Sequence, residues 1–286
     1  MNPTKAPEDF GGRLDTVFDQ YGHLCVGIDP HPYLFDRWGF DDSSRTLTEF
    51  SLRVLDACVG KVGLIKPQVA FYERWGSSGY SALETLIHRA REAGILVIAD
   101  AKRGDIGSTM QAYAQTWLSS GSPLESDAMT ASPYLGLGSL TDTLRIAEAQ
   151  GKGVFVLAAT SNAEAREVQS AVIEHGDRAG STLARSMMQG VIDFNRQVEK
   201  CVGGVVIGAT VNLRDFAVDA EEFTGLPVLA PGFGFQGADP KDAGRLFGPL
   251  AQRLIVTETR SILEAGPDAI NETISRRAGL ISEALR

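Results

Sequence analysis

Short apolar runs alternate along the chain with longer stretches of mixed polarity. Eight runs have the length of β-strands, and they cover residues 24–29, 62–66, 95–100, 128–133, 153–159, 204–209, 227–231 and 254–258. The stretches between them predict helices at 44–59, 77–93, 107–119, 139–150, 178–200, 239–248 and 268–284, with an initial helix at about 8–20. Because no hairpin signals separate the runs, the pattern indicates parallel strands joined by helices.

The predicted strands are almost continuously apolar, which is typical of a parallel sheet that is buried on both faces. Eight strand–helix units favour a closed (β/α)8 barrel over an open, doubly wound sheet. The length of 286 residues is near the usual size of such a barrel, and no low-complexity linker divides the chain. We therefore expect a single domain over residues 1–286, an α/β TIM barrel with an N-terminal capping helix.

Composition narrows the class of protein. No run of 18 apolar residues is present, so we expect no membrane span. The first residues, MNPTKAPEDFGGRL, carry both charges and no apolar stretch, which argues against a secretory signal. Cys25, Cys58 and Cys201 are scattered, and two of them lie in or beside apolar runs. This arrangement indicates buried thiols in a reducing cytoplasm rather than a disulfide framework.

The charge balance and the histidines exclude two further classes of site. The net charge is −9 and the pI is about 5.0, which argues against a nucleic-acid partner because such proteins usually present a basic face. A few local cations still suffice to bind one small phosphate. The four histidines are far apart and lack metal-ligand spacing, so we expect no metal site.

Charged residues follow the first three predicted strands. Asp29 ends the first strand, Lys66 the second, and Asp100 and Lys102 the third, while Asp105 follows on the loop. In barrels of this kind the chemistry lies at the C-terminal ends of the strands. Side chains alternate along a strand, so Asp100 and Lys102 are expected to point the same way. Because buried charges are costly unless paired, Lys66, Asp100, Lys102 and Asp105 are expected to form an alternating cluster.

Two other interpretations of these charges remain open. The four residues could form a solvated rim or a purely structural network of ion pairs. Alternatively, Lys102 or Lys66 could form a Schiff base, which requires an uncharged amine. Neighbouring carboxylates favour the charged ammonium form, so the pattern favours a cationic proton donor over an amine nucleophile.

A second signal lies near the end of the chain. The segment PGFGFQG (231–237) follows the seventh strand, and its glycines allow backbone N–H groups to approach an anion. Arg260 and Ser261 follow the eighth strand and begin another possible helix. Barrels often bind phosphate at these two loops, although a Gly-x-Gly segment is equally well a tight turn.

These segments resemble a known family. DAKRGDIGST (100–109) is similar to the signature of the orotidine 5′-phosphate decarboxylases. The order VGIDPHP (26–32), IKPQVAFYERWG (65–76), ASPYLG (131–136), ATSN (159–162), APGFGFQG (230–237) and TRSIL (259–263) resembles its longer, type 2 bacterial branch. The resemblance runs from about residue 8 to 284. The Asp-x-Lys-x-x-Asp core is shared with a wider suprafamily, and the flanking motifs narrow the assignment.

The resemblance implies cofactor-free decarboxylation of orotidine 5′-phosphate to UMP in pyrimidine biosynthesis. Lys66, Asp100, Lys102 and Asp105 match the catalytic network. Lys102 would protonate C6, Asp100 would lie against the substrate carboxylate, and Lys66 would hold Asp100 and contact the ribose. Asp105 and Thr109 would reach the active site of the partner in a homodimer. Asp is also a favoured helix N-cap, so Asp105 capping its own helix stays open.

The resemblance also implies the residues that bind the nucleotide. Asp29 would bind the ribose hydroxyls, and Ser161 would hydrogen-bond the pyrimidine. Gln236 and Arg260 would grip the 5′-phosphate, together with the backbone at Gly234.

The chain departs from the family pattern at two positions. Ala163 and Ala238 stand where the family often has Pro and Gly, which affects the geometry around Ser161 and the path of the phosphate loop. Two alternative functions remain. One is a metal-dependent sugar-phosphate decarboxylase or lyase of the same suprafamily, disfavoured because Lys66 would compete with the ion. The other is a non-catalytic barrel that binds nucleotides.

Overall fold

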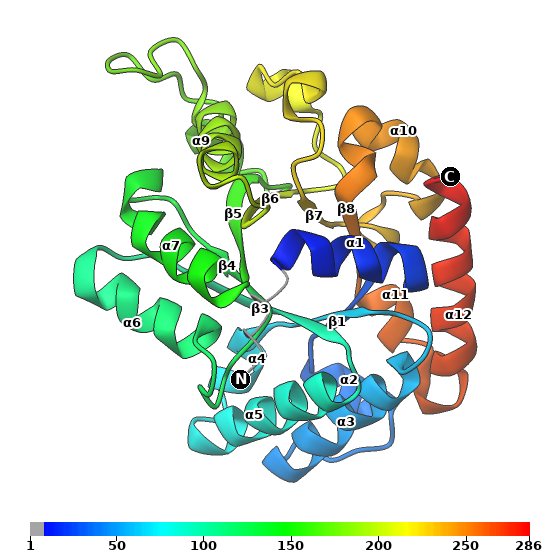
Figure 1. Cartoon of the computed structure of the whole chain (residues 1–286). Helices are drawn as coiled ribbons and strands as arrows, with labels where there is room; N and C mark the ends of the chain where they lie inside the picture. Colours follow the sequence, from blue (N-terminus) through cyan, green and yellow to red (C-terminus); the bar gives the residue numbers. More distant parts are fainter. Residues whose placement is uncertain (1–8) are drawn as a thin grey trace, which may run out of the picture.

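Eight parallel strands form a closed barrel in chain order (Figure 1). The computed structural model describes residues 9–286. The strands are β1 (Leu24–Ile28), β2 (Leu64–Pro67), β3 (Leu96–Arg103), β4 (Ala128–Ala131), β5 (Gly153–Ala159), β6 (Gly203–Ile207), β7 (Val228–Pro231) and β8 (Leu254–Glu258). Parallel pairing of β8 with β1 closes the barrel. The predicted (β/α)8 fold is confirmed.

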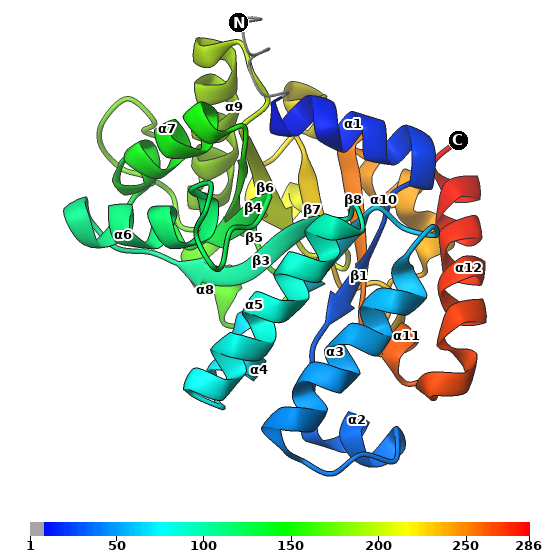
Figure 2. The ribbon, with the colours of Figure 1, turned by 60° about the horizontal axis from the view of Figure 1, so that its bottom comes forward.

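Helices surround the barrel on the outside (Figure 2). The helices between and after the strands are α3 (Ser44–Cys58), α5 (Ser77–Glu92), α6 (Gly107–Leu118), α7 (Thr141–Gln150), α9 (Leu183–Val198), α10 (Ala243–Phe247) and α12 (Gly266–Ala284). Four shorter helices follow the C-terminal ends of strands: α2 (Pro32–Arg37), α4 (Val69–Glu73), α8 (Ala165–Gln169) and α11 (Arg260–Leu263). The short helices are too brief to carry a periodic signal, and the sequence did not predict α2, α4 or α8. Helix α11 begins at Arg260, where the sequence indicated a possible helix.

Two predicted helices have different bounds in the structure. The helix expected at 178–200 begins only at Leu183, because the Thr182 side chain accepts a hydrogen bond from the Arg185 amide and caps it there. Gly180 before it has a φ of 84°, which a helix does not allow. The helix expected at 239–248 divides into a short 3-10 turn at Pro240–Asp242 and α10, which ends at Gly248 with a φ of 49°.

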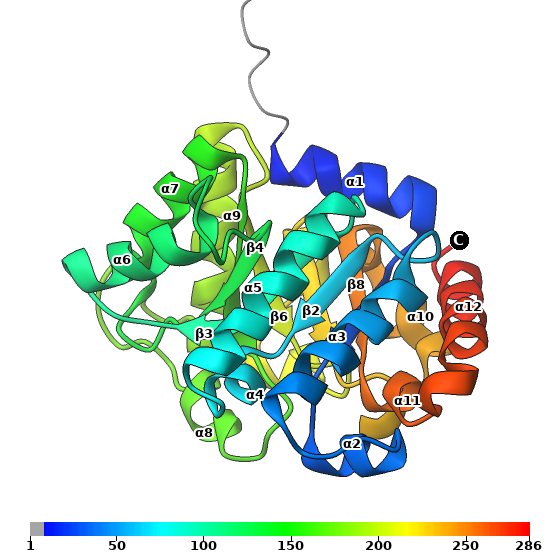
Figure 3. The ribbon, with the colours of Figure 1, turned by 90° about the horizontal axis from the view of Figure 1, so that it is seen from below.

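Helix α1 (Phe10–Tyr21) closes the N-terminal end of the barrel. Phe10, Leu14 and Val17 pack into the barrel interior, where the Phe10 ring meets Phe155 edge to face at 5.9 Å. Figure 3 shows α1 at one end of the barrel and α2, α4, α8 and α11 at the other. The predicted capping helix is thereby confirmed, although its expected start at residue 8 lies outside the described residues. Because α1 closes the N-terminal end, the C-terminal end of the barrel is the end at which a functional site can form.

The cysteines agree only in part with the expectation of buried thiols, since Cys25 and Cys58 are buried and Cys201 is partly buried. All three cysteines are free, and burial raises the pKa of the Cys25 thiol to about 12. Burial likewise raises the pKa of the Cys201 thiol to about 11. Over residues 9–286, no helix combines the length and the apolar character needed to cross a membrane.

Candidate active site

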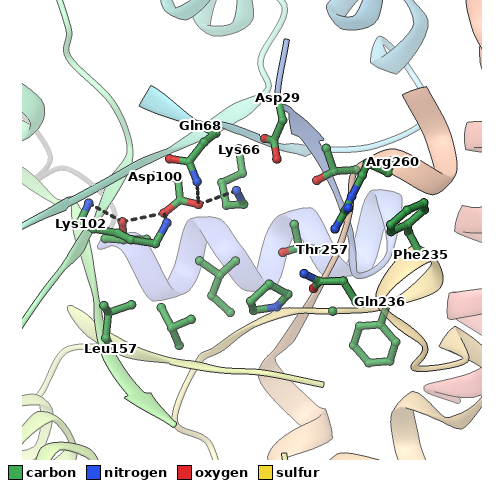
Figure 4. A pocket seen from close by; sticks show the side chains of 17 residues that line it. Asp29, Lys66, Gln68, Asp100, Lys102, Leu157, Phe235, Gln236, Thr257 and Arg260 are labelled. Carbon is green, nitrogen blue, oxygen red and sulfur yellow. Dashed lines mark hydrogen bonds and ion pairs between the residues drawn. The ribbon is translucent and has the colours of Figure 1, made fainter. Parts of the chain in front are cut away.

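A cavity of about 210 Å³ opens at the C-terminal ends of the strands (Figure 4). Its charged and polar side chains come mainly from β1, β2, β3 and β8, while β5, β6 and β7 supply an apolar side. The lining comprises Asp29, Lys66, Gln68, Asp100, Lys102, Thr130, Leu157, Val206, Leu229, Pro231, Gly232, Phe233, Phe235, Gln236, Thr257, Thr259 and Arg260. The cavity therefore joins a charged half to an apolar half.

Asp100 is the centre of the charged half. Lys66 Nζ donates to its Oδ2 at 2.7 Å, and Lys102 Nζ donates to its Oδ1 at 2.5 Å. Gln68 Nε2 adds a bond to Oδ2 at 3.0 Å, and the Thr130 hydroxyl adds one to Oδ1 at 3.0 Å. Four donors thus fix both carboxylate oxygens, so the carboxylate has one orientation.

The two lysines determine the charge state of Asp100. Burial alone would raise the pKa of this carboxyl, but the positive charges of Lys66 and Lys102 outweigh burial and hold it well below its usual range. Lys66 is itself buried, which disfavours its charge, yet the carboxylates of Asp100 and Asp29 raise its pKa above the ordinary value. Asp100 and Lys66 are therefore both ionised at neutral pH. The Lys102 side chain is 45% exposed, so its ammonium is accessible to a ligand in the cavity.

The backbone at Lys102 departs from the regular strand that the sequence predicted. Lys102 has a φ of 47°, and the register of β3 against β4 shifts between Ala99 and Arg103. Its amide donates to the Thr130 side chain at 2.9 Å. Lys102 therefore reaches Asp100 through an irregular backbone, and not through the simple alternation of side chains.

Asp29 lies directly after β1 with one oxygen unsatisfied. Its Oδ1 is enclosed and has no hydrogen-bond partner among residues 9–286. Burial raises the pKa of this carboxyl, and the nearby charge of Lys66 offsets only part of that effect. A buried acceptor without a donor is costly, so Asp29 is suited to a ligand that brings a hydroxyl group.

The opposite wall of the cavity carries Gln236 and Arg260. Gln236 ends the 3-10 turn η4 (Gly234–Gln236) after β7, and Arg260 is the first residue of α11 after β8. The Arg260 guanidinium lies over the Phe235 ring, 3.8 Å from its centre. Within the described part of the chain, no carboxylate pairs with this guanidinium. A cation without a protein counter-ion at a cavity wall is suited to an anionic ligand.

Four sequence-predicted site residues do not line this cavity. Asp105 accepts a hydrogen bond from the next amide, that of Ile106, at 2.8 Å, and Ile106 is the N-cap position of α6. Asp105 therefore does not cap the helix in the expected way. Thr109 and Ser161 are exposed. Gly234 immediately precedes Phe235 in the sequence and has a φ of 72°. The structure thus brings together Asp29, Lys66, Asp100, Lys102, Gln236 and Arg260 in one chain.

The two departures from the family pattern fit the loops that contain them. Ala238 is buried, its carbonyl accepts from the Gly234 amide at 2.8 Å, and its amide donates to the Gly232 carbonyl at 3.3 Å. These bonds close the turn after β7 without a glycine at this position. Ala163 lies on an exposed turn, where its carbonyl accepts from the Arg166 amide at 3.3 Å.

Sequence reasoning missed two residues that contact Asp100. Gln68 lies two residues after Lys66 within a motif that was already singled out, so alternation along the strand was an available signal. Thr130 is a single hydroxyl residue between apolar neighbours in β4, and nothing in its spacing separated it from a core threonine.

The residues present do not form a metal site of the usual kind. Across residues 9–286, no three His, Cys, Asp or Glu side chains come together in a way that could hold an ion. Around Asp100, the positions that a cation would occupy are held by the ammonium groups of Lys66 and Lys102.

Comparison with known proteins places the chain among decarboxylases. The profile of the orotidine 5′-phosphate decarboxylase / HUMPS family matches residues 22–272. The orotidine 5′-phosphate decarboxylase of Streptomyces coelicolor is 46% identical over 263 residues, covering 91% of this chain and 92% of that protein. The enzyme of the same name from Salinispora tropica is 46% identical over 268 residues, covering 92% of each.

A solved structure agrees with the sequence relatives. A Streptomyces avermitilis protein, provisionally assigned as an orotidine 5′-phosphate decarboxylase, superimposes with a TM-score of 0.90 and 43% identity. The match covers 98% of this chain and 97% of that one. The fold, the profile and relatives well above 30% identity agree over nearly the whole length, and this chain belongs to the orotidine 5′-phosphate decarboxylase / HUMPS family.

Proposed function

We propose that this protein decarboxylates orotidine 5′-phosphate to UMP without a cofactor, as a carboxy-lyase of pyrimidine biosynthesis. The observation that carries the proposal is the hydrogen-bonded series Lys66–Asp100–Lys102 in a cavity at the C-terminal end of the barrel. The relatives named for this reaction are 46% identical over more than nine-tenths of the chain.

Lys102 is the proposed proton donor. Loss of CO2 breaks the bond from C6 to the carboxylate carbon and leaves its electron pair on C6. A fixed ammonium beside C6 stabilises that charge and then supplies the proton. Asp100 lies against the substrate carboxylate, and the repulsion between the two carboxylates is relieved as CO2 departs. Lys66 keeps Asp100 in place and stays charged because it has two carboxylate neighbours.

The remaining site residues are proposed to hold the nucleotide. The unsatisfied Asp29 Oδ1 accepts from a ribose hydroxyl. Gln236 and Arg260 bind the 5′-phosphate, and among residues 9–286 no carboxylate pairs with the Arg260 guanidinium. Gly234, whose amide donates to the Ala238 carbonyl at 2.8 Å, is proposed to hold the turn that carries Gln236 beside the phosphate. Ser161 is proposed to bind the pyrimidine. Because Ser161 is exposed, this contact requires its loop to move toward the cavity.

The cluster favours this function over the two alternatives. A metal-dependent sugar-phosphate decarboxylase or lyase needs several oxygen ligands free for a divalent ion. Here both oxygens of Asp100 are bound by cationic and neutral donors. The backbone strain at Lys102 costs free energy, and strain of this kind clusters at active sites. A barrel that only binds nucleotides would not need a strained, accessible lysine beside an ionised carboxylate.

We further propose a homodimer in which Asp105 and Thr109 serve the partner's site. The loops after β3 and β4 lie side by side, since the Ser132 amide donates to the Arg103 carbonyl at 2.8 Å. They expose large apolar side chains: Ile106 is 62% exposed and Tyr134 is 83% exposed. A second copy would cover them. We also propose that the chain is a single domain and that it acts in the reducing cytoplasm, which the three free thiols support.

The proposed reaction is tested by absorbance. Wild-type protein mixed with orotidine 5′-phosphate should consume it, and dialysis against a strong chelator should leave the rate unchanged. Lys102→Met should lower kcat by about 10³-fold or more, because general acid catalysis and charge stabilisation are both lost. UMP should still bind.

Three outcomes would argue against the proposal. Thermal stabilisation by the nucleotide without turnover would favour the binding protein. A chelator-sensitive rate that magnesium or zinc restores would favour the lyase. Activity in the Lys102→Met variant would show that Lys102 is not the proton donor.

A further inference from the structure

Phe235 is an exposed aromatic residue at the mouth of the cavity. Its side chain is 56% exposed, and its ring lies against the Arg260 guanidinium, 3.8 Å from ring centre to guanidinium carbon. Both residues line the cavity, as Figure 4 shows. A phenylalanine exposed to this degree buries too little surface to serve the core, so its contact with Arg260 is the feature to explain.

The stacking geometry leaves the useful part of Arg260 available. A cation–π contact uses the flat face of the guanidinium, whereas its N–H groups point outward in the plane of the group. Inside the range 9–286, those N–H groups have neither a carboxylate nor another hydrogen-bond acceptor within bonding distance. A long, flexible side chain is thus held by its face while its donors remain free for an anion.

The backbone around Phe235 fixes the position of the ring. Gly234 and Gly237, with φ values of 72° and 108°, flank Phe235 and Gln236. Gly234 packs closely against Ser261, whose Oγ would lie 2.7 Å from a Cβ added there. The turn after β7 is therefore anchored to the helix that begins with Arg260, and Phe235 is carried on the same turn as Gln236.

We propose that Phe235 is a positioning residue for phosphate recognition. Its ring, carried on the turn after β7, orients the guanidinium of Arg260, the first residue of α11, so that the N–H edge faces the 5′-phosphate. The inference rests on the proposed nucleotide substrate. In this proposal Phe235 contacts neither the ribose nor the base, so the effect of Phe235 on binding passes through Arg260 alone.

The experiment compares ligands with and without the phosphate. Phe235→Leu should weaken UMP binding about tenfold in calorimetry and change uridine binding by less than about twofold, because only the phosphate contact is affected. Phe235→Trp should keep UMP affinity within about twofold of the wild type, since an indole ring stacks at least as well. In turnover, Phe235→Leu should raise KM with kcat nearly unchanged, as expected for loss of uniform binding.

A double-mutant cycle and a matched control test the route of the effect. In an Arg260→Ala background, Phe235→Leu should change UMP affinity by less than about twofold, because the arginine that the ring orients is gone. Phe40→Leu removes the ring that lies under Arg53 at 4.9 Å, outside the cavity, and should leave UMP affinity unchanged.

The inference and the proposed function fail in distinguishable ways. Absence of turnover by the wild type overturns the function, while equilibrium binding of UMP and inorganic phosphate still measures the role of Phe235. The role of Phe235 would be overturned if Phe235→Leu left the affinity for UMP unaltered or weakened the binding of UMP and uridine equally. It would also be overturned if Phe235→Leu weakened UMP binding as much in the Arg260→Ala background as in the wild type.

Discussion

At the scale of single residues, the site concentrates both charge and strain around one carboxylate. Lys102 has a φ of 47°, a conformation that costs a non-glycine residue on the order of 1–3 kcal/mol. The Thr130 hydroxyl compensates by accepting from the Lys102 amide and donating to Asp100. The sequence predicted Lys66, Asp100 and Lys102 because each ends a strand. It did not predict the strained backbone, which depends on how β3 registers against β4.

Asp29 allows a test of the conflict between stability and function. Burial raises its pKa, so the folded protein holds this proton more tightly than the unfolded chain does. This proton binding stabilises the folded state fully below the unfolded pKa of about 4. The stabilisation is lost as the pH rises through the raised pKa of the folded state. Asp29→Asn should therefore increase the free energy of unfolding by roughly 0.5–2 kcal/mol near neutral pH, a typical gain for one stabilising substitution.

The measurement for Asp29 is urea unfolding of the variant and the wild type at neutral and acidic pH. The stability difference should shrink toward zero below about pH 4, where Asp29 is protonated in both the folded and the unfolded wild type. Asp36→Asn, at an exposed position, is the matched control and should show no such trend. A variant that is less stable than the wild type near neutral pH would contradict the interpretation that the Asp29 charge is insufficiently compensated.

At the scale of elements, the predicted strands agree with the structure better than the predicted helices. Strands buried on both faces leave continuous apolar runs, so all eight were located to within a few residues. Helix ends depend on local capping, and the start of α9 is set by the Thr182 side chain rather than by hydrophobic period. The short helix α8 buries no residue, so hydrophobic periodicity does not mark it.

The attachment of α1 to the barrel is a prediction at the same scale. Arg13 on α1 donates to Asp127 at 2.5 Å and to the Gly151 carbonyl at 2.7 Å. The Asp127 side chain is only 7% exposed, so Arg13→Ala removes a donor from a buried carboxylate. We expect a loss of about 1–3 kcal/mol in the free energy of unfolding, measured in urea.

A surface arginine is the matched control for Arg13. Arg53 pairs with Glu49 four residues away on α3, and both side chains are more than 40% exposed. Arg53→Ala should cost less than about 0.5 kcal/mol, because exposed ion pairs of this spacing contribute little. Similar losses in the two variants would mean that the Arg13 contacts do not help to hold α1 against the barrel.

At the scale of the whole molecule, four of the predicted site residues lie outside the cavity of this chain. The residues that strands position were predictable from the sequence, and they meet in one cavity. Ser161 lies on an exposed loop whose base is fixed by Gln169, which bonds to the amide and the hydroxyl of Thr160 at 2.8 and 3.0 Å. Loop positions of this kind depend on contacts with other elements, or with another chain, and strand spacing does not encode them.

A mixing experiment tests the proposal that each active site is shared. Asp105 lies beyond the strand that carries Asp100 and Lys102, and it does not line the cavity of its own chain. Lys102→Ala and Asp105→Ala dimers should each be nearly inactive. In a mixed dimer, one site combines both defects. The other takes Lys102 from the Asp105→Ala chain and Asp105 from the Lys102→Ala chain, so it is intact.

The expected recovery follows from the two-fold symmetry of a dimer. If the two inactive variants are unfolded together and refolded, random pairing makes about half of the dimers mixed, and roughly a quarter of all sites regain full activity. Mixed dimers are identified independently by giving one chain an affinity tag. A refolded mixture that contains mixed dimers yet stays as inactive as its parents would show that Asp105 serves its own chain. The exposed Ile106 and Tyr134 would then require another explanation.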